Sequence, residues 1–255
     1  MSLIRHLLFL ATFLSSVSIV HAETIRVAVA SNFAPVARQL QSDFESTTSH
    51  NVIFSVGSSG VLYAQISKGA PFDVFLSADS QRPESLEQAG KVFAGSRQTY
   101  ARGRLVWWQP EANALSLDNL GAFSGRLAIA NPRFAPYGQA AMSVLAKLQL
   151  NTLPLVRGAN VSQAFQFADT GNAPAALVPL SLLKPKLSPN LSAKSGATSK
   201  YSHFVLIPQD WHEEIAQQMV ILKDSKKIQA ALEFSDFLLS NASQTRIAQL
   251  GYQHP

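Results

Sequence analysis

The sequence predicts an α/β fold divided into two lobes, each a mainly parallel sheet flanked by helices. Short apolar strands alternate with segments of helical period, which is typical of parallel sheets covered by helices. The pattern changes near Tyr100–Arg104, where a new strand rich in aromatic residues begins. The 233 residues that follow the first 22 are enough for two such lobes.

The first 22 residues have the pattern of a secretory signal peptide. Arg5 precedes an apolar run from Leu7 to Leu14, and Val20-His21-Ala22 offers small residues at the cleavage positions. An uncleaved anchor is the alternative, but the run is shorter than the roughly 20 residues that span a membrane. We therefore expect an exported protein whose mature chain begins near Glu23.

The first lobe begins with strand, turn and helix units in succession. Val36, Leu40 and Phe44 recur at helical spacing, and the polar turns Ser31-Asn32 and Gly57–Gly60 separate the elements. The predicted elements are a strand at Ile25–Ala30, a helix at Phe33–Phe44, a strand at Asn51–Val56, a helix at Val61–Ser67 and a strand at Asp73–Ser77.

The second lobe repeats this alternation, and the chain then returns to the first. The predicted elements are strands at Leu105–Trp108, Leu127–Ala130, Ala175–Leu180 and Phe204–Ile207, helices at Gln139–Leu148 and Ala164–Thr170, then a strand at Met219–Leu222 and two helices within Lys227–Leu250. Lys184–Lys200, rich in Ser, Lys and Pro, predicts a surface loop. We expect residues 23–102 and 208–255 to form lobe 1, and 103–207 to form lobe 2. Successive strand residues face opposite ways, so of Trp107 and Trp108 we expect one in the core and one at the surface.

Composition excludes several classes of function. The net charge of +5 falls to +4 when Arg5 is removed, and the charges are dispersed, so the basic cluster of a nucleic-acid binder is missing. The chain has no cysteine, which excludes a disulfide framework, thiolate catalysis and a lipid anchor on a cysteine of its own. The histidines lack ligand-like spacing, so we predict no direct metal ligation and no cofactor.

Two turns carry hydroxyls or amides where a helix begins: Ser31-Asn32 and Ser58-Ser59. Such residues are preferred N-caps, which is the simpler interpretation of either turn alone. In an open parallel sheet, however, ligands bind outside the carboxyl ends of the strands, where both turns must lie. Helix N-termini there present N–H donors and a partial positive charge to an anion.

Two further turns, one before each helix of lobe 2, have the same character. Tyr137 sits in Ala135-Pro-Tyr-Gly138 and can offer a hydroxyl or its own N–H, and Asn160-Val161 precedes the other helix. For the Tyr137 turn, the alternative is a Pro-Gly turn with a surface tyrosine. Four such turns, two from each lobe, would surround a small anion without any charged residue.

The motifs in these turns resemble the molybdate-binding proteins of bacterial molybdate ABC transporters, which are type II periplasmic binding proteins. They cover most of the mature chain in the family's order, and the run from Gly69 to Asp79 is the most distinctive. The matching motifs are Val27-Ala-Val-Ala-Ser31-Asn32-Phe33, Gly57-Ser-Ser59-Gly60, Ile66-Ser-Lys-Gly-Ala-Pro-Phe-Asp73-Val-Phe-Leu-Ser-Ala-Asp79, Asn131-Pro-Arg-Phe-Ala-Pro-Tyr137-Gly-Gln-Ala-Ala141 and Asn160-Val161-Ser-Gln-Ala164.

The resemblance implies a ligand in the cleft between the lobes, held by hydroxyls and backbone N–H groups. It assigns this role to Ser31, Asn32, Ser59, Tyr137 and Val161, with Ser58 and Asn160 as possible additions. Molybdenum would be bound as its oxyanion, molybdate, with tungstate as a second ligand. One branch of the family adds a late-strand tyrosine, and the matching position here is Pro179, so that contact must be missing or replaced. The implied partner is the membrane permease of an ABC transporter, and we expect a monomer.

Two alternatives stay open at this point. Within the binding class, the ligand could be sulfate, phosphonate or an organic carboxylate, and Arg133 is the one arginine in a proposed cleft turn that could pair with a carboxylate. Outside it, Ser181-Leu-Leu-Lys184 matches the Ser-x-x-Lys pattern of serine hydrolases, but neither Ser-Asp-Asn nor Lys-Thr-Gly accompanies it. We therefore expect a binding protein and not an enzyme.

Overall fold

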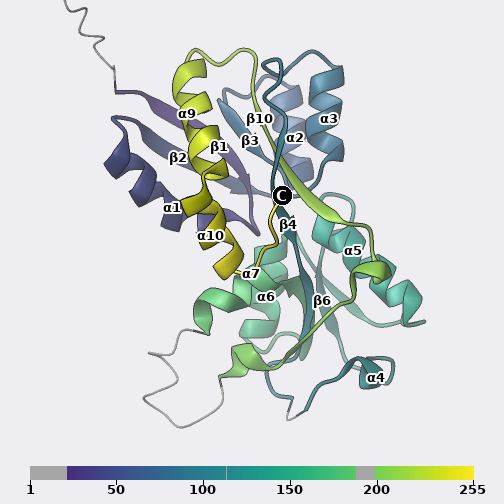
Figure 1. Ribbon diagram of the computed structural model, residues 1–255. Coiled ribbons are helices and arrows are strands. Elements are labelled where there is room, and N and C mark those ends of the chain that lie inside the picture. The colour runs from purple at the N-terminus through teal and green to yellow at the C-terminus, as the bar shows by residue number, and fades with distance from the viewer. Residues whose placement is uncertain (1–21, 113, 188–198) are drawn as a thin grey trace, which may run out of the picture.

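A computed structural model describes residues 22–112, 114–187 and 199–255, which form two sheets, each flanked by helices (Figure 1). We call each sheet with its helices a lobe. The predicted signal peptide and the central part of the predicted loop at Lys184–Lys200 lie outside the described residues. None of the helices in the described ranges has both the length and the apolar character needed to cross a membrane.

The lobe 1 sheet has the strand order β2-β1-β3-β10-β4. Strand β1 pairs in parallel with β2 and β3, whereas β10 is antiparallel to both β3 and β4. Four strands therefore run in one direction and β10 in the other, which confirms the mainly parallel sheet. The strands are β1 (Thr24–Ala30), β2 (Asn51–Gly57), β3 (Val74–Leu76), β4 (Gln98–Gly103) and β10 (Ile215–Ile221), and the helices are α1 (Ala34–Thr47), α2 (Ser59–Ser67), α3 (Gln81–Gln88), α9 (Ile228–Leu239) and α10 (Asn241–Gln249).

The lobe 2 sheet has the order β7-β6-β8-β5-β9 and repeats this plan. Strand β6 pairs in parallel with β7 and β8, while β5 is antiparallel to β8 and β9. The strands are β5 (Leu105–Trp108), β6 (Leu127–Ala130), β7 (Leu155–Gly158), β8 (Ala175–Pro179) and β9 (Phe204–Leu206). The helices are α4 (Leu117–Leu120), α5 (Pro136–Lys147), α6 (Val161–Asp169) and α7 (Leu180–Leu183), with 3₁₀ turns at Lys184–Lys186, Lys200–Ser202 and Gln209–Trp211.

The chain passes between the lobes along two paired strands. It leaves lobe 1 through β4, which continues into β5, and returns from β9 into β10, which pairs with β4 (Figure 1). After α10 the last residues return to this junction, where Gln253 forms a bridge with Arg102 of β4. Because few strands join the lobes, their relative position depends on contacts made across the cleft.

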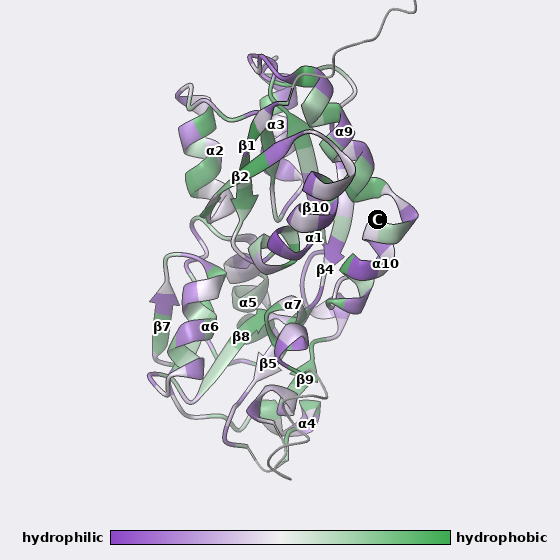
Figure 2. Ribbon diagram, turned by 90° about the vertical axis from the view of Figure 1, so that its left-hand side faces the viewer, coloured by the Kyte–Doolittle hydropathy of each residue, from purple (hydrophilic) through white to green (hydrophobic). Residues whose placement is uncertain are grey.

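Side chains alternate along β1, so the core of lobe 1 lies on both faces of the sheet. The hydropathy colouring of Figure 2 shows β1 mostly in green, the colour of hydrophobic residues. Val27 and Val29 pack on one face against Val36, Leu40 and Phe44 of α1, as the helical spacing predicted. Ala28, between them in the sequence, faces the opposite cluster that contains Leu62 and Ile66 of α2. Burial of these apolar side chains holds α1 and α2 against opposite faces of the sheet, and both helices begin at the same edge of it.

Sequence and structure differ at three helix starts. The predicted helices at Val61, Gln139 and Ala164 begin two or three residues earlier, at Ser59, Pro136 and Val161. Polar turn residues and proline, which favour turns in isolation, are here part of the first helical turn. The earlier starts place Ser59, Tyr137 and Val161 in first turns, where backbone N–H groups lack helical partners.

The expectation for the tryptophan pair was wrong. Trp107 and Trp108 are both fully buried, because β5 lies inside its sheet and helices or loops cover both faces. Trp107 packs edge-on against Phe123 with ring centroids 5.1 Å apart, and Trp108 stacks on Phe165 at 4.8 Å. The pair therefore builds the lobe 2 core.

Candidate functional site

Four strand-to-helix turns, two from each lobe, meet at a small cavity between the lobes. The structure brings six of the predicted site residues to its lining: Ser31, Asn32, Ser58, Ser59, Tyr137 and Val161. The cavity has a volume of about 10 Å³, close to the 10–15 Å³ that one water molecule needs on the same scale. The lobes are therefore closed upon the site, and the place predicted for the ligand is almost filled by the residues around it.

Backbone N–H groups from all four turns remain available in this cavity. Ser59, Tyr137 and Val161 lie in the first turns of α2, α5 and α6. Within the described ranges, no backbone acceptor pairs with these three N–H groups or with that of Asn32, which precedes α1. Each of these helices also directs the positive end of its dipole at the cavity, so the arrangement favours an anion.

Serine hydroxyls add to these donors. Ser58 Oγ is buried and has no hydrogen-bond partner among the described residues. Ser59 Oγ accepts a hydrogen bond from the backbone N–H of Ala78 at 2.9 Å, so its own hydrogen can be donated elsewhere. Both hydroxyls are therefore free to donate to a ligand.

The N-cap interpretation does not hold for the lobe 1 turns. The N-cap positions of α1 and α2 are Phe33 and Ser58, and neither makes a side-chain cap hydrogen bond. In lobe 2 the simpler interpretation does hold for Asn160, because its side chain accepts from the Gln163 N–H at 3.1 Å and caps α6. Asn160 thus supports the helix that presents Val161.

Two hydrogen bonds join the lobes beside the cavity. The Gly60 N–H donates to the carbonyl oxygen of Phe134 at 2.8 Å, and Ser162 Oγ donates to the carbonyl oxygen of Ser31 at 3.0 Å. A Cβ added to Gly60 would lie 2.9 Å from that same Phe134 oxygen, so only glycine fits this contact without a shift. Both bonds join a residue of lobe 1 to a residue of lobe 2, and they hold the lobes together around the site.

A buried polar network lies directly behind the cavity, and sequence reasoning missed most of it. The Asn32 amide nitrogen donates to Gln217 Oε1 at 2.8 Å and to the Tyr252 hydroxyl at 3.0 Å. The amide nitrogen of Gln217 donates to the Tyr137 hydroxyl at 3.2 Å, and Ser181 Oγ donates to that of Tyr252 at 3.0 Å. One signal could have indicated it, since Gln217 and Gln218 are two polar residues in an otherwise apolar strand that ends at Ile221.

The cavity lining carries no lysine, arginine, aspartate or glutamate. Arg133, the predicted alternative partner for a carboxylate, is exposed, with its guanidinium over the Phe134 ring at 5.3 Å. Desolvation by burial raises the pKa values of Tyr137 and Tyr252 well above the ordinary tyrosine value, so both hydroxyls stay protonated. The site therefore offers neutral donors and helix dipoles in place of a formal positive charge.

Pro179 and Ser181 have structural roles: Pro179 ends a strand, and Ser181 belongs to the network behind the cavity. Pro179 ends β8 opposite Leu105 and does not line the cavity, so no late-strand tyrosine hydroxyl comes from this position. Ser181 is buried in the network behind the cavity, whereas Lys184 is exposed. The Ser-x-x-Lys pattern therefore does not form a nucleophile and base pair that a substrate could reach.

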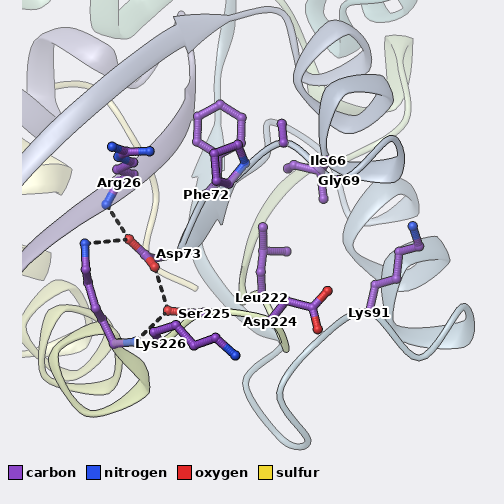
Figure 3. A pocket seen from close by; sticks show the side chains of 13 residues that line it. Arg26, Ile66, Gly69, Phe72, Asp73, Lys91, Leu222, Asp224, Ser225 and Lys226 are labelled. Carbon is purple, nitrogen blue, oxygen red and sulfur yellow. Dashed lines mark hydrogen bonds and ion pairs between the residues drawn. The ribbon is translucent and has the colours of Figure 1, made fainter.

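A larger cavity, of about 450 Å³, lies within lobe 1 at the opposite edge of its sheet (Figure 3). Its buried carboxylate, Asp73, accepts hydrogen bonds from the backbone N–H of Arg26 at 2.7 Å and from Ser225 Oγ at 2.6 Å. Asp224 adds a second carboxylate to the lining, and Arg26, Lys91, Lys226 and Lys227 add four cationic side chains, so charge alone does not decide between the two cavities. We assign the site to the smaller cavity, because backbone donors converge there and both lobes enclose it.

The described residues contain no cluster of three or more histidine, aspartate or glutamate side chains that could hold a metal ion.

Comparisons with known proteins identify the family to which this chain belongs. The family model described as "Bacterial extracellular solute-binding protein" matches residues 25–253. The molybdate-binding protein ModA of Azotobacter vinelandii is 41% identical over 239 residues, which cover 91% of this chain and 90% of that protein. The chain is a bacterial extracellular solute-binding protein of the ModA family. It is thus a binding protein and not an enzyme.

Two further comparisons support this family assignment. ModA of Rhodobacter capsulatus is 39% identical to this solute-binding protein over 238 residues, which cover 91% of the chain and 88% of the relative. The solved structure of the Azotobacter vinelandii periplasmic molybdate-binding protein superposes with a TM-score of 0.81 and 33% identity, over 91% of this chain and 99% of that one. The predicted fold, an α/β protein with two helix-flanked sheets, is thereby confirmed.

Proposed function

We propose that this protein captures molybdate in the periplasm and delivers it to the permease of an ABC transporter. The observation that carries the proposal is the convergence of four unpaired backbone N–H groups, from Asn32, Ser59, Tyr137 and Val161, on one cavity. The relatives at 41% and 39% identity are molybdate-binding proteins by name, and tungstate, with the same shape and charge, is the second expected ligand.

The donor set suits a tetrahedral dianion. An unpaired buried charge is costly, but hydrogen bonds to a charged group each contribute about 1.5–3 kcal/mol. The residues that carry these N–H groups line the cavity from both lobes, together with Ser31 and Ser58, so we expect every oxygen of a tetrahedral ion to accept at least one bond. Neutral donors also permit release, because no opposite charge holds the ion in place.

Selectivity is expected to depend on the spacing of the lobes. The cavity as it stands holds about one water molecule, so the lobes must separate to admit an anion and then close around it. Molybdate is larger than sulfate, and a sulfate ion would leave some donors beyond hydrogen-bond distance. Cavity size thus discriminates between two ions of the same charge and shape.

The expected location follows from the relatives and the N-terminus. The first 22 residues are proposed to direct export and to be removed, which leaves a monomer that starts near Glu23. The related protein of known structure is described as periplasmic. The closed, ligand-bound form is proposed to be the one that docks on the permease.

Titration calorimetry of residues 23–255 tests the proposal. We expect one-to-one binding of molybdate and tungstate with submicromolar Kd, and no heat from sulfate at the same concentration. Failure of all three oxyanions to bind would overturn the proposal, and binding of a small carboxylate instead would assign the site to organic anions.

A further inference from the structure

We infer that Gln217 is a positioning residue for the anion site. In the closed form, its side chain joins the Asn32 turn of lobe 1 to Tyr137 of lobe 2. The inference rests on the proposed function and extends it to a residue that does not line the cavity. Gln217 lies on β10 and is fully buried. Its amide group contacts Asn32 and Tyr137, which line the cavity from lobe 1 and lobe 2, respectively.

The directions of the hydrogen bonds that join Tyr252, Asn32 and Gln217 follow from one backbone carbonyl. The Asn32 carbonyl oxygen can only accept, so the Tyr252 hydroxyl donates to it, at 2.9 Å. The Tyr252 oxygen must then accept from the Asn32 side chain, which fixes that amide with its nitrogen toward Tyr252 and Gln217. Gln217 therefore presents Oε1 to Asn32.

The other end of the Gln217 amide is thereby directed at lobe 2. Its Nε2 donates to the Tyr137 hydroxyl at 3.2 Å, and that tyrosine is fully enclosed. Tyr137 is in the first turn of α5, so fixing its ring also fixes the N–H that the same residue directs at the cavity. One amide side chain thus relates two anion donors, one from each lobe.

Gly103, at the end of β4, provides the space for this contact. A Cβ at this position would lie 2.1 Å from the Tyr137 hydroxyl oxygen and 2.9 Å from Gln217 Nε2. The tyrosine thus reaches across the junction between the lobes to the strands that connect them. Separation of the lobes would draw Tyr137 away from Gln217, so this bond belongs to the closed form.

A double-mutant cycle on molybdate affinity tests the inference. We expect Gln217→Leu and Tyr137→Phe each to weaken binding by about tenfold or more. Tyr137→Phe leaves the Gln217 amide nitrogen without its acceptor, and Gln217→Leu removes a partner of both the Asn32 amide and the Tyr137 hydroxyl. The double variant should bind no more weakly than Gln217→Leu alone, because that variant already lacks the bond that Tyr137→Phe removes. Tyr137→Phe keeps the ring and tests the same bond if Gln217→Leu does not fold.

Gln218→Leu is the matched control, since Gln218 is the next residue on β10 and its amide donates to Thr99 Oγ1 within lobe 1. This variant should bind molybdate as the parent does. Small-angle scattering should show that the parent becomes more compact with saturating molybdate and that the Gln217→Leu variant needs about ten times more anion for the same change.

The outcomes separate the inference from the proposed function. Parent-like affinity in both single variants, or additive losses in the double variant, would overturn the role of Gln217 alone. A fall in unfolding free energy with unchanged affinity would do the same, because it would show a purely structural residue. Absence of molybdate binding by the parent protein would overturn both.

Discussion

Substitution of Gly60 by alanine separates closure of the lobes from stability of the fold. The added Cβ would lie 2.9 Å from the Phe134 oxygen and 3.0 Å from the Phe134 Cα, and both are backbone atoms of the opposite lobe. Contacts this short do not persist, so the closed lobes must move apart by a few tenths of an ångström. The Gly60 hydrogen bond to Phe134, now 2.8 Å, is then stretched or lost.

The magnitude follows from two effects. Loss of the hydrogen bond costs about 0.5–1.5 kcal/mol and overpacking about 1–3 kcal/mol, so a combined central value of about 3 kcal/mol predicts roughly 150-fold weaker molybdate binding. The ligand-free protein avoids the clash by opening. Alanine in the first turn of α2 should leave its unfolding free energy unchanged or raise it by about 0.4–1 kcal/mol.

Calorimetry with molybdate and urea unfolding without ligand measure the two quantities. Gly121→Ala is the control, because no atom lies within 4 Å of the added Cβ, and both quantities should stay at the parent values. Parent-like affinity of Gly60→Ala would refute the reasoning, because it would show that this contact between the lobes is absent from the bound form.

Three further predictions concern the site and the network behind it. Ser59→Ala should weaken molybdate binding at least tenfold by calorimetry. The free energy of unfolding in urea should fall by about 1–3 kcal/mol, because the Ala78 N–H stays buried without its acceptor. Unchanged affinity would remove Ser59 from the site. Arg133→Ala should bind molybdate within twofold of the parent in the same titration, since this arginine is exposed over Phe134, and a tenfold loss would make it an anion partner. Burial raises the pKa values of Tyr100, Tyr137 and Tyr252 above the unfolded value, so the stability they contribute is complete below about pH 10 and is lost as the pH rises toward the folded values. Urea unfolding from pH 8 to 12 should show this loss, with a slope of up to about 1.4 kcal/mol per pH unit for each tyrosine, and Tyr137→Phe should remove the share of one; an unchanged slope would contradict it.

The sequence predicted the fold well because the relevant signals are local. Apolar strands and helical spacing, such as Val36, Leu40 and Phe44, depend on a few consecutive residues, and the structure buries all three. The alternation of strand and helix then placed the turns at one edge of each sheet. Helix starts were late because turn-forming residues, such as Ser59, were assigned to loops when tertiary packing extends the helix through them.

Of the candidate site, only residues that line the cavity could be predicted from the sequence. Ser31, Ser59 and Tyr137 could be found because they sit in motifs at strand ends, and the structure brings them to one cavity. Gln217 and Tyr252 could not, because they meet Asn32 across 185 and 220 residues of sequence, respectively, and no local pattern specifies such contacts. The burial of both tryptophans likewise depends on the neighbours of β5 in the sheet.

The position of bound molybdate tests the central claim most directly. Crystals of residues 23–255 grown with molybdate should show one anomalous peak for molybdenum between the lobes, with its oxygens within hydrogen-bond distance of the backbone N–H groups of Asn32, Ser59, Tyr137 and Val161. A molybdenum peak elsewhere, such as in the lobe 1 cavity beside Arg26 and Lys226, would contradict the account.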